Sequence, residues 1–102
     1  MRRVIEDELI ANGIYPNLIG FEYVCIIVEY IIDSDRVIKI MKLYELVADI
    51  KNTTTEAVER SIRTIVSKYN RGSDKKLCNS EFIYTMALKI KREVHERWII
   101  LR

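Results

Sequence analysis

The chain has 102 residues, of which 49% are hydrophobic and 31% charged, and its net charge is +2 at pH 7. This length suits one compact domain and excludes two, while one proline and three glycines exclude a loop-rich or disordered chain. The nearly balanced charge is weak support for a nucleic-acid partner, because a basic stripe is more informative than a basic total.

The first third of the chain predicts two helices. A helix over 2–12 has an apolar side, and Gly13 suits a left-handed end to it. A second helix is expected over 17–32, with Asn17 as its cap. This segment is apolar nearly all round, which is typical of a central helix. Its β-branched run 25–28 also has strand propensity, but the length of the segment and the lack of a partner strand favour a helix.

The middle of the chain predicts two helices separated by a short break. Residues 36–41 fit either a short helical turn or an extended link. Apolar residues then recur at spacings of three and four over 42–51, which predicts a helix. Polar residues at 52–54 end that helix, and a further helix is expected over 55–69.

The last quarter of the chain predicts a loop and one more helix. A solvated loop is expected over 71–76. The final helix begins at Asn79 or Ser80, since either residue is a good cap, and it runs to about Trp98. Together these segments predict a compact all-α fold of five to six helices, forming a single domain over 1–102.

Cysteine and histidine are too scarce for a metal site. Cys25, Cys78 and His95 are the only such residues, whereas a structural zinc needs about four ligands. Cys25 lies in the most apolar segment and is expected to be a small buried hydrophobe. The apolar stretch 18–32 is shorter than the ~20 residues of a membrane span, and the N-terminus has no signal-peptide pattern. We expect a cytoplasmic protein without metal, cofactor or membrane segment.

The segment from about 42–69 has the pattern of a helix-turn-helix. A helix, a three-residue turn and a longer helix follow one another, as in DNA-binding motifs of that kind. Ala48 provides the small side chain needed where the two helices cross. Thr54 or Thr55 can cap the second helix and leave its N-terminal end able to approach phosphates.

The second helix of this pattern has two faces. At ~100° per residue, Val58, Ile62 and Ile65 fall on one side. The opposite side carries long polar side chains: Glu56, Glu59, Arg60, Arg63, Ser67 and Arg71. Arginine fits the two acceptors on the edge of guanine, and a carboxylate accepts from the amino group of cytosine. Any surface helix shows a similar division, and Glu59 with Arg63 also forms an ordinary i,i+4 pair.

Residues around this polar face are the expected contacts to phosphate. They share a hydroxyl or a positive charge near the ends or flanks of the second helix. The expected set is Lys51, Thr54, Thr55, Ser67, Lys68 and Arg71, with Lys75 and Lys76 nearby.

The run 52–63, Asn-Thr-Thr-Thr-Glu-Ala-Val-Glu-Arg-Ser-Ile-Arg, resembles the recognition helix of a known family. This family is the C-terminal effector domain of the sporulation initiation response regulator, stage-zero sporulation protein A, of endospore-forming bacteria. Further matches cover the first turn, the second, third and last helices and the end of the recognition helix: 13–14, 20–23, 43–44, 47–48, 69–72 and 79–83. The resemblance extends over about residues 5–95, in register except for one gap.

The resemblance implies a helix-turn-helix domain that binds double-stranded DNA. It implies a short asymmetric element resembling TGTCGAA, often bound in tandem or as a homodimer. The family's base-reading positions fall on Glu59, Arg60 and Arg63, and all three residue types are retained. This retention implies a similar target sequence.

Three departures from the family pattern modify these expectations. We expect no receiver domain in this chain, so phosphorylation-driven dimerisation is not expected of it. The loop between Gly72 and Asn79 is shorter than in the family, which argues against contact with an RNA polymerase sigma factor. Glu56 and Ala57 stand where the family has a basic or small polar residue, which removes a phosphate contact.

Two classes of function remain after these observations. The first is a sequence-specific DNA-binding transcriptional regulator. The alternative is a protein-interaction module or antagonist, which pairs with a homologous regulator through the last helix or the apolar tail 98–101 and has no useful DNA affinity. An enzyme is not expected, because no phosphate-cradling glycine loop exists and His95 has no cysteine near it in the sequence.

Overall fold

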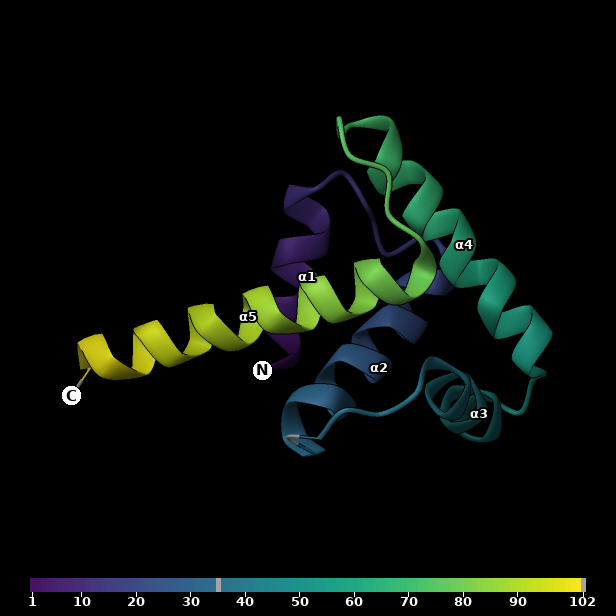
Figure 1. Ribbon diagram of the computed structural model, residues 1–102, viewed down its shortest axis with the longest axis horizontal. Helices are drawn as coiled ribbons and strands as arrows, with labels where there is room; N and C mark the ends of the chain where they lie inside the picture. The colour runs from purple at the N-terminus through teal and green to yellow at the C-terminus, as the bar shows by residue number, and fades with distance from the viewer. Residues whose placement is uncertain (35, 102) are drawn as a thin grey trace.

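A computed structural model describes residues 1–34 and 36–101, with side chains described to residue 96. The prediction of an all-α fold is confirmed. The described chain forms five helices (Figure 1): α1 (Arg2–Ala11), α2 (Ile19–Ser34), α3 (Ile40–Lys51), α4 (Thr55–Arg71) and α5 (Asn79–Leu101). The apolar tail 98–101, one of the two surfaces expected to pair with a homologous regulator, lies outside the described side chains.

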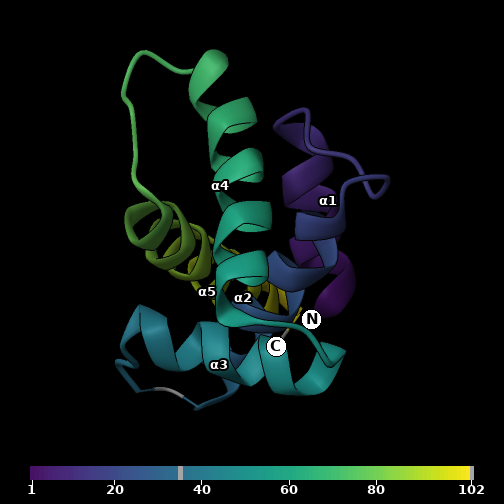
Figure 2. The ribbon, with the colours of Figure 1, turned by 90° about the vertical axis from the view of Figure 1, so that its right-hand side faces the viewer.

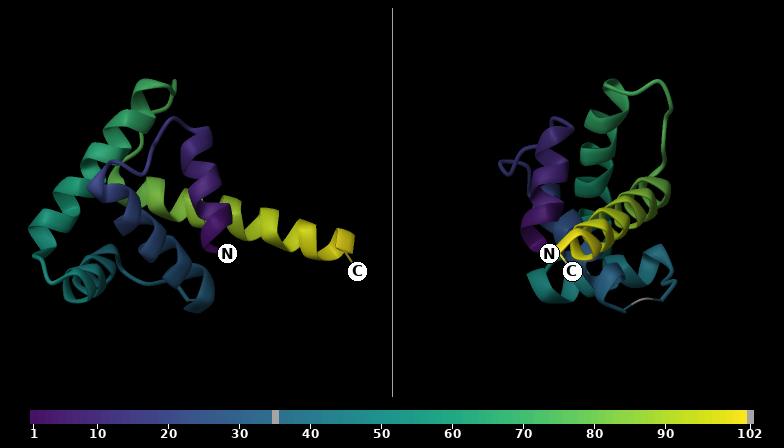
Figure 3. Two further views of the ribbon diagram at one scale, coloured as in Figure 1. Left: turned by 180° about the vertical axis from the view of Figure 1, so that it is seen from behind. Right: turned by 90° about the vertical axis from the view of Figure 1, so that its left-hand side faces the viewer.

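Helix α2 is the central element of the fold. It packs against each of the other four helices, and its buried side includes Phe21, Val24 and Ile27. The helix continues through 25–28, as the length of the apolar segment predicted. Figure 3 shows α3 and α4 lying toward one end of the molecule, while the C-terminal part of α5 extends toward the other end. One connected core results, with buried residues from all five helices.

The first connector explains where α1 ends and α2 begins. Gly13 has a φ of 81°, and the Ile14 N–H donates to the Leu9 carbonyl at 3.0 Å, which forms the predicted left-handed helix end. The prediction that Asn17 caps α2 is wrong. The Leu18 N–H donates to the Tyr15 carbonyl at 3.3 Å, closing a turn with proline in its second position. Because Asn17 is the third residue of this turn, it does not cap the helix, and α2 begins at Ile19.

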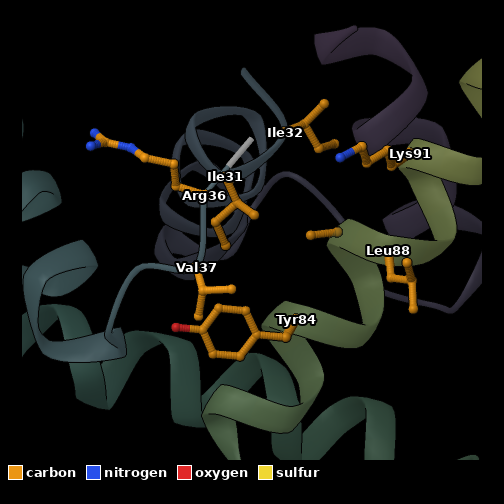
Figure 4. A pocket seen from close by; sticks show the side chains of 8 residues that line it. Ile31, Ile32, Arg36, Val37, Tyr84, Leu88 and Lys91 are labelled. Carbon is orange, nitrogen blue, oxygen red and sulfur yellow. The ribbon is translucent and has the colours of Figure 1, made fainter. Parts of the chain in front are cut away.

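The second connector is an extended link and not a helical turn over most of its length. Lys39 has extended backbone angles, and α3 begins directly after it. Tyr84 of α5 donates its hydroxyl hydrogen to the Ile38 carbonyl, which holds the connector against α5. Figure 4 shows the Tyr84 ring beside Val37, at an apolar pocket between the connector, the end of α2 and α5.

Helix α5 begins at Asn79, as predicted, but neither of the two predicted residues is its cap. Both Asn79 and Ser80 lie inside the helix, and the Cys78 N–H donates to the Glu81 carboxylate at 2.9 Å. This bond is one half of a capping box, in which the carboxylate of the third helical residue accepts a hydrogen bond from the main-chain N–H of the cap residue. It also lowers the pKa of Glu81. The predicted start of the helix is therefore correct, but the predicted cap is wrong, because the side chain of Glu81 and not that of Asn79 or Ser80 satisfies the N–H at this helix end.

The two cysteines have opposite surroundings. Cys25 is fully buried in α2, and Cys78 is exposed. Burial raises the pKa of the Cys25 thiol to about 12, so the thiol stays protonated and unreactive near neutral pH. This confirms Cys25 as a small core residue. Among the described helices, none is long and apolar enough to cross a membrane.

Candidate nucleic-acid interface

The turn between α3 and α4 fixes the geometry of the helix-turn-helix. Asn52 adopts a left-handed conformation with a φ of 52°, and the Thr53 N–H donates to the Ala48 carbonyl at 2.9 Å. Asparagine tolerates this conformation better than most residues, so it ends α3 in the role that glycine often takes. The Thr54 hydroxyl then accepts a hydrogen bond from the Ala57 N–H at 3.1 Å. Of the two predicted caps, Thr54 is therefore the one used.

Helix α4 presents its polar face to solvent while its apolar face enters the core. Figure 2 shows α4 crossing the front of the molecule, with α3 below it. The buried side consists of four aliphatic residues: Val58, Ile62, Ile65 and Val66. Arg60, Arg63 and Ser67 are exposed on the opposite side, and Glu59 is half-buried at its edge. A straight helix with this division can enter a major groove while the core anchors its back.

A glycine allows α4 to lie directly against α2. A Cβ atom placed on Gly20 would lie 2.4 Å from the Ser61 carbonyl oxygen and 2.7 Å from Ile65 Cγ1. Both distances are far below normal contact, so only glycine permits this spacing. The main chain of α2 thus supports the middle of α4, directly behind its exposed arginines.

Two of the predicted base-reading residues form a pair. The Arg63 guanidinium donates to both carboxylate oxygens of Glu59, with Nε at 3.1 Å from Oε1 and Nη2 close to Oε2. The bidentate hydrogen bond raises the pKa of Arg63. Arg60 lies one residue after Glu59 and is exposed; among the described residues, no ion pair holds its side chain. Glu59 therefore holds the Arg63 side chain in one orientation, whereas no ion pair among the described residues restrains Arg60.

Some of the residues predicted to contact phosphate are exposed to solvent, whereas Lys51 is held in an ion pair within the protein. Ser67, Lys68 and Arg71 are exposed along α4. Lys51 forms an ion pair with Glu22 of α2, with Nζ at 3.4 Å from Oε1. The C-terminal part of α4 therefore carries the more accessible positive charge.

The loop after α4 is held in place by side chains of its own. The Asn70 amide donates to the Leu77 carbonyl at 2.9 Å and accepts from the Leu77 N–H at 3.0 Å. Lys76 Nζ donates to the Asn70 carbonyl at 2.6 Å, at the carbonyl end of α4. These contacts close the loop against the helix, so it borders the polar face on the side of α5.

Sequence reasoning missed two residues next to the Glu59–Arg63 pair. The side-chain amide of Asn79 in α5 donates one hydrogen bond to the Tyr44 hydroxyl of α3 and one to the main-chain carbonyl of Glu59. No role was predicted for Tyr44 from the sequence, and Asn79 was predicted only as a helix cap. No local pattern brings together residues that far apart in the sequence.

The fold and the exposed face of α4 define a helix-turn-helix DNA-binding domain. Residues 5–99 match the family described as sporulation initiation factor Spo0A, C terminal, and the chain belongs to that family. The resemblance seen in the sequence is thereby confirmed. Comparison with curated proteins and with solved structures found no match. The family is the DNA-binding effector domain of a transcriptional regulator of sporulation, and double-stranded DNA is its partner. It is not a family of enzymes.

Proposed function

We propose that this domain recognises a short asymmetric duplex resembling TGTCGAA by inserting α4 into the major groove. Glu59, Arg60 and Arg63 read base edges. The observation that carries the proposal is the retained set of these three residues on the exposed side of a helix whose back is anchored in the core. Arginine matches the acceptor pair of guanine and glutamate matches the amino group of cytosine, and both base types occur in the TGTCGAA element.

Phosphate contacts position the helix on the duplex. Ser67, Lys68 and Arg71 lie along the exposed part of α4 and face the backbone on one side of the groove. Thr54 and Thr55 stand at the N-terminal end of α4, where helix N–H groups and the helix dipole favour an anion. Lys51 joins this set only after leaving Glu22.

The exposed Glu56 sets a limit on affinity. It lies in the first turn of α4, beside the expected phosphate contacts at that end. A carboxylate there stabilises the helix through the dipole but repels a phosphate. Specific binding therefore depends strongly on the base contacts. We expect the domain to act in the cytoplasm, where bacterial chromosomal DNA lies.

The test is equilibrium binding to two fluorescent duplexes, one carrying TGTCGAA and one with the same bases scrambled. Anisotropy is measured at one fixed salt concentration of about 0.15 M, because phosphate contacts alone give salt-sensitive affinity without sequence preference. We expect the TGTCGAA duplex to bind at least ~10³-fold more tightly.

Equal and weak binding to both duplexes would contradict this proposal. It would favour the alternative of a protein-interaction module that pairs with a homologous regulator. Equal but tight binding, with a steep salt dependence, would instead reveal a DNA-binding protein without sequence preference.

A further inference from the structure

A hydrogen-bonded junction ties the start of α5 to both helices of the helix-turn-helix. The Asn79 amide nitrogen lies 3.2 Å from the Tyr44 hydroxyl oxygen and 3.4 Å from the Glu59 carbonyl oxygen. These partners are separated from Asn79 by 35 and 20 residues in the sequence. The junction therefore stabilises a tertiary arrangement and is not a local helix cap.

The chemistry of the three groups fixes the direction of both bonds. A peptide carbonyl oxygen only accepts, so the Asn79 atom that faces Glu59 must be the amide nitrogen. An amide nitrogen only donates, so the Tyr44 oxygen must accept from it. Burial of Tyr44, which is 4% exposed, keeps its phenol neutral and able to act in this way.

The junction lies next to the paired side chains of the proposed reading face. Tyr44, Glu59 and Arg63 line both of the surface grooves that flank the pair. Asn79 holds the main chain of Glu59, while the carboxylate of the same residue holds the Arg63 guanidinium. A substitution of Asn79 should therefore displace Glu59, and through Glu59 also the Arg63 side chain.

We propose that Asn79 and Tyr44 are positioning residues for base readout. They set the main chain of α4 at Glu59, so that Glu59 and Arg63 reach base edges in the correct alignment. Hydrogen bonds to bases need placement to within about 0.5 Å, whereas attraction between cations and phosphates tolerates larger shifts. This inference rests on the proposed reading role of α4. It adds two residues that do not need to touch DNA.

The first test uses Asn79→Ala and Tyr44→Phe, separately and together, in the anisotropy assay with both duplexes. Tyr44→Phe, which removes one hydrogen bond, should lower the ratio of specific to scrambled affinity about 3- to 10-fold. Asn79→Ala, which removes two, should lower the ratio at least as much, and the scrambled affinity should stay unchanged in both variants. The double variant should lose little more than Asn79→Ala alone, because the two residues act as one unit. Tyr84→Phe is the matched control. It removes a hydroxyl that bonds the Ile38 carbonyl and lines neither groove, so the ratio should not change.

The second test needs no DNA. The NMR signal of the Arg63 Nε–H, which is held by Glu59, should shift and exchange faster with water in Asn79→Ala but not in Tyr84→Phe. An unchanged signal, or an equal loss of affinity for both duplexes, overturns the positioning role. If the wild-type protein does not distinguish the duplexes, the reading function fails and the Arg63 signal alone decides whether the junction positions the pair. Should Asn79→Ala not fold, Tyr44→Phe decides both tests, because it keeps the buried ring.

Discussion

Gly20→Ala is expected to destabilise the fold by several kcal/mol and to prevent stable folding at 37 °C. The added methyl group would lie 2.4 Å from a main-chain oxygen of α4, which cannot rotate away as a flexible side chain can. Overpacking of a core contact costs about 1–3 kcal/mol and more where the backbone must move. The higher helix propensity of alanine offsets only about 1 kcal/mol of this loss of stability. Helices α2 and α4 must therefore separate at Gly20, behind the exposed side of α4 that carries Arg60 and Arg63.

Thermal and urea unfolding of Gly20→Ala measure this effect directly. Gly72→Ala is the matched control, since a Cβ there meets only the Tyr69 carbonyl oxygen at 3.9 Å. The control should change stability by less than about 1 kcal/mol, in either direction. Equal stability of the Gly20 variant and the wild type would show that α2 and α4 are not in the close contact described here.

Arg60→Ala is expected to lower affinity for the TGTCGAA duplex about 5- to 150-fold, which corresponds to about 1–3 kcal/mol. The side chain is exposed and has no ion pair among the described residues, so it reaches DNA without losing an internal contact. Its removal should weaken preference for one base pair and leave the stability of the free domain within about 0.5 kcal/mol.

A second arginine provides the control for Arg60. Arg92→Ala removes the same charge from the exposed far part of α5, which extends away from α4 (Figure 1). It should change affinity for both duplexes slightly and equally. If Arg60→Ala also weakened both duplexes by the same factor, Arg60 would be a phosphate contact and the assignment of the reading residues would be wrong.

The polar and apolar faces of α4 were predictable because they depend only on the period of a helix. Val58 and Ile62 recur on one side for a local reason, and the structure buries both. The break after α3 was predictable for a similar reason, since asparagine followed by two threonines ends one helix and caps the next. These features need no knowledge of the rest of the fold.

Features that depend on distant partners were not predictable in the same way. The pairing of Lys51 with Glu22 requires α2 and α3 to be placed first, and so does the contact of Asn79 with Tyr44. The start of α5 was predicted correctly, but its cap was not, because the capping bond uses the side chain of Glu81, the third residue of the helix. Periodicity locates helices well, but it does not show which of their polar groups meet.

The most direct measurement of the central claim is an NMR titration of the ¹⁵N-labelled domain with the TGTCGAA duplex. We expect the largest chemical-shift changes at the N-terminal end and on the exposed side of α4, including the Nε–H signals of Arg60 and Arg63. Signals near Leu88 on α5 should change little. Large shifts confined to the exposed part of α5, with α4 unaffected, would show that another surface meets the DNA and would contradict the account.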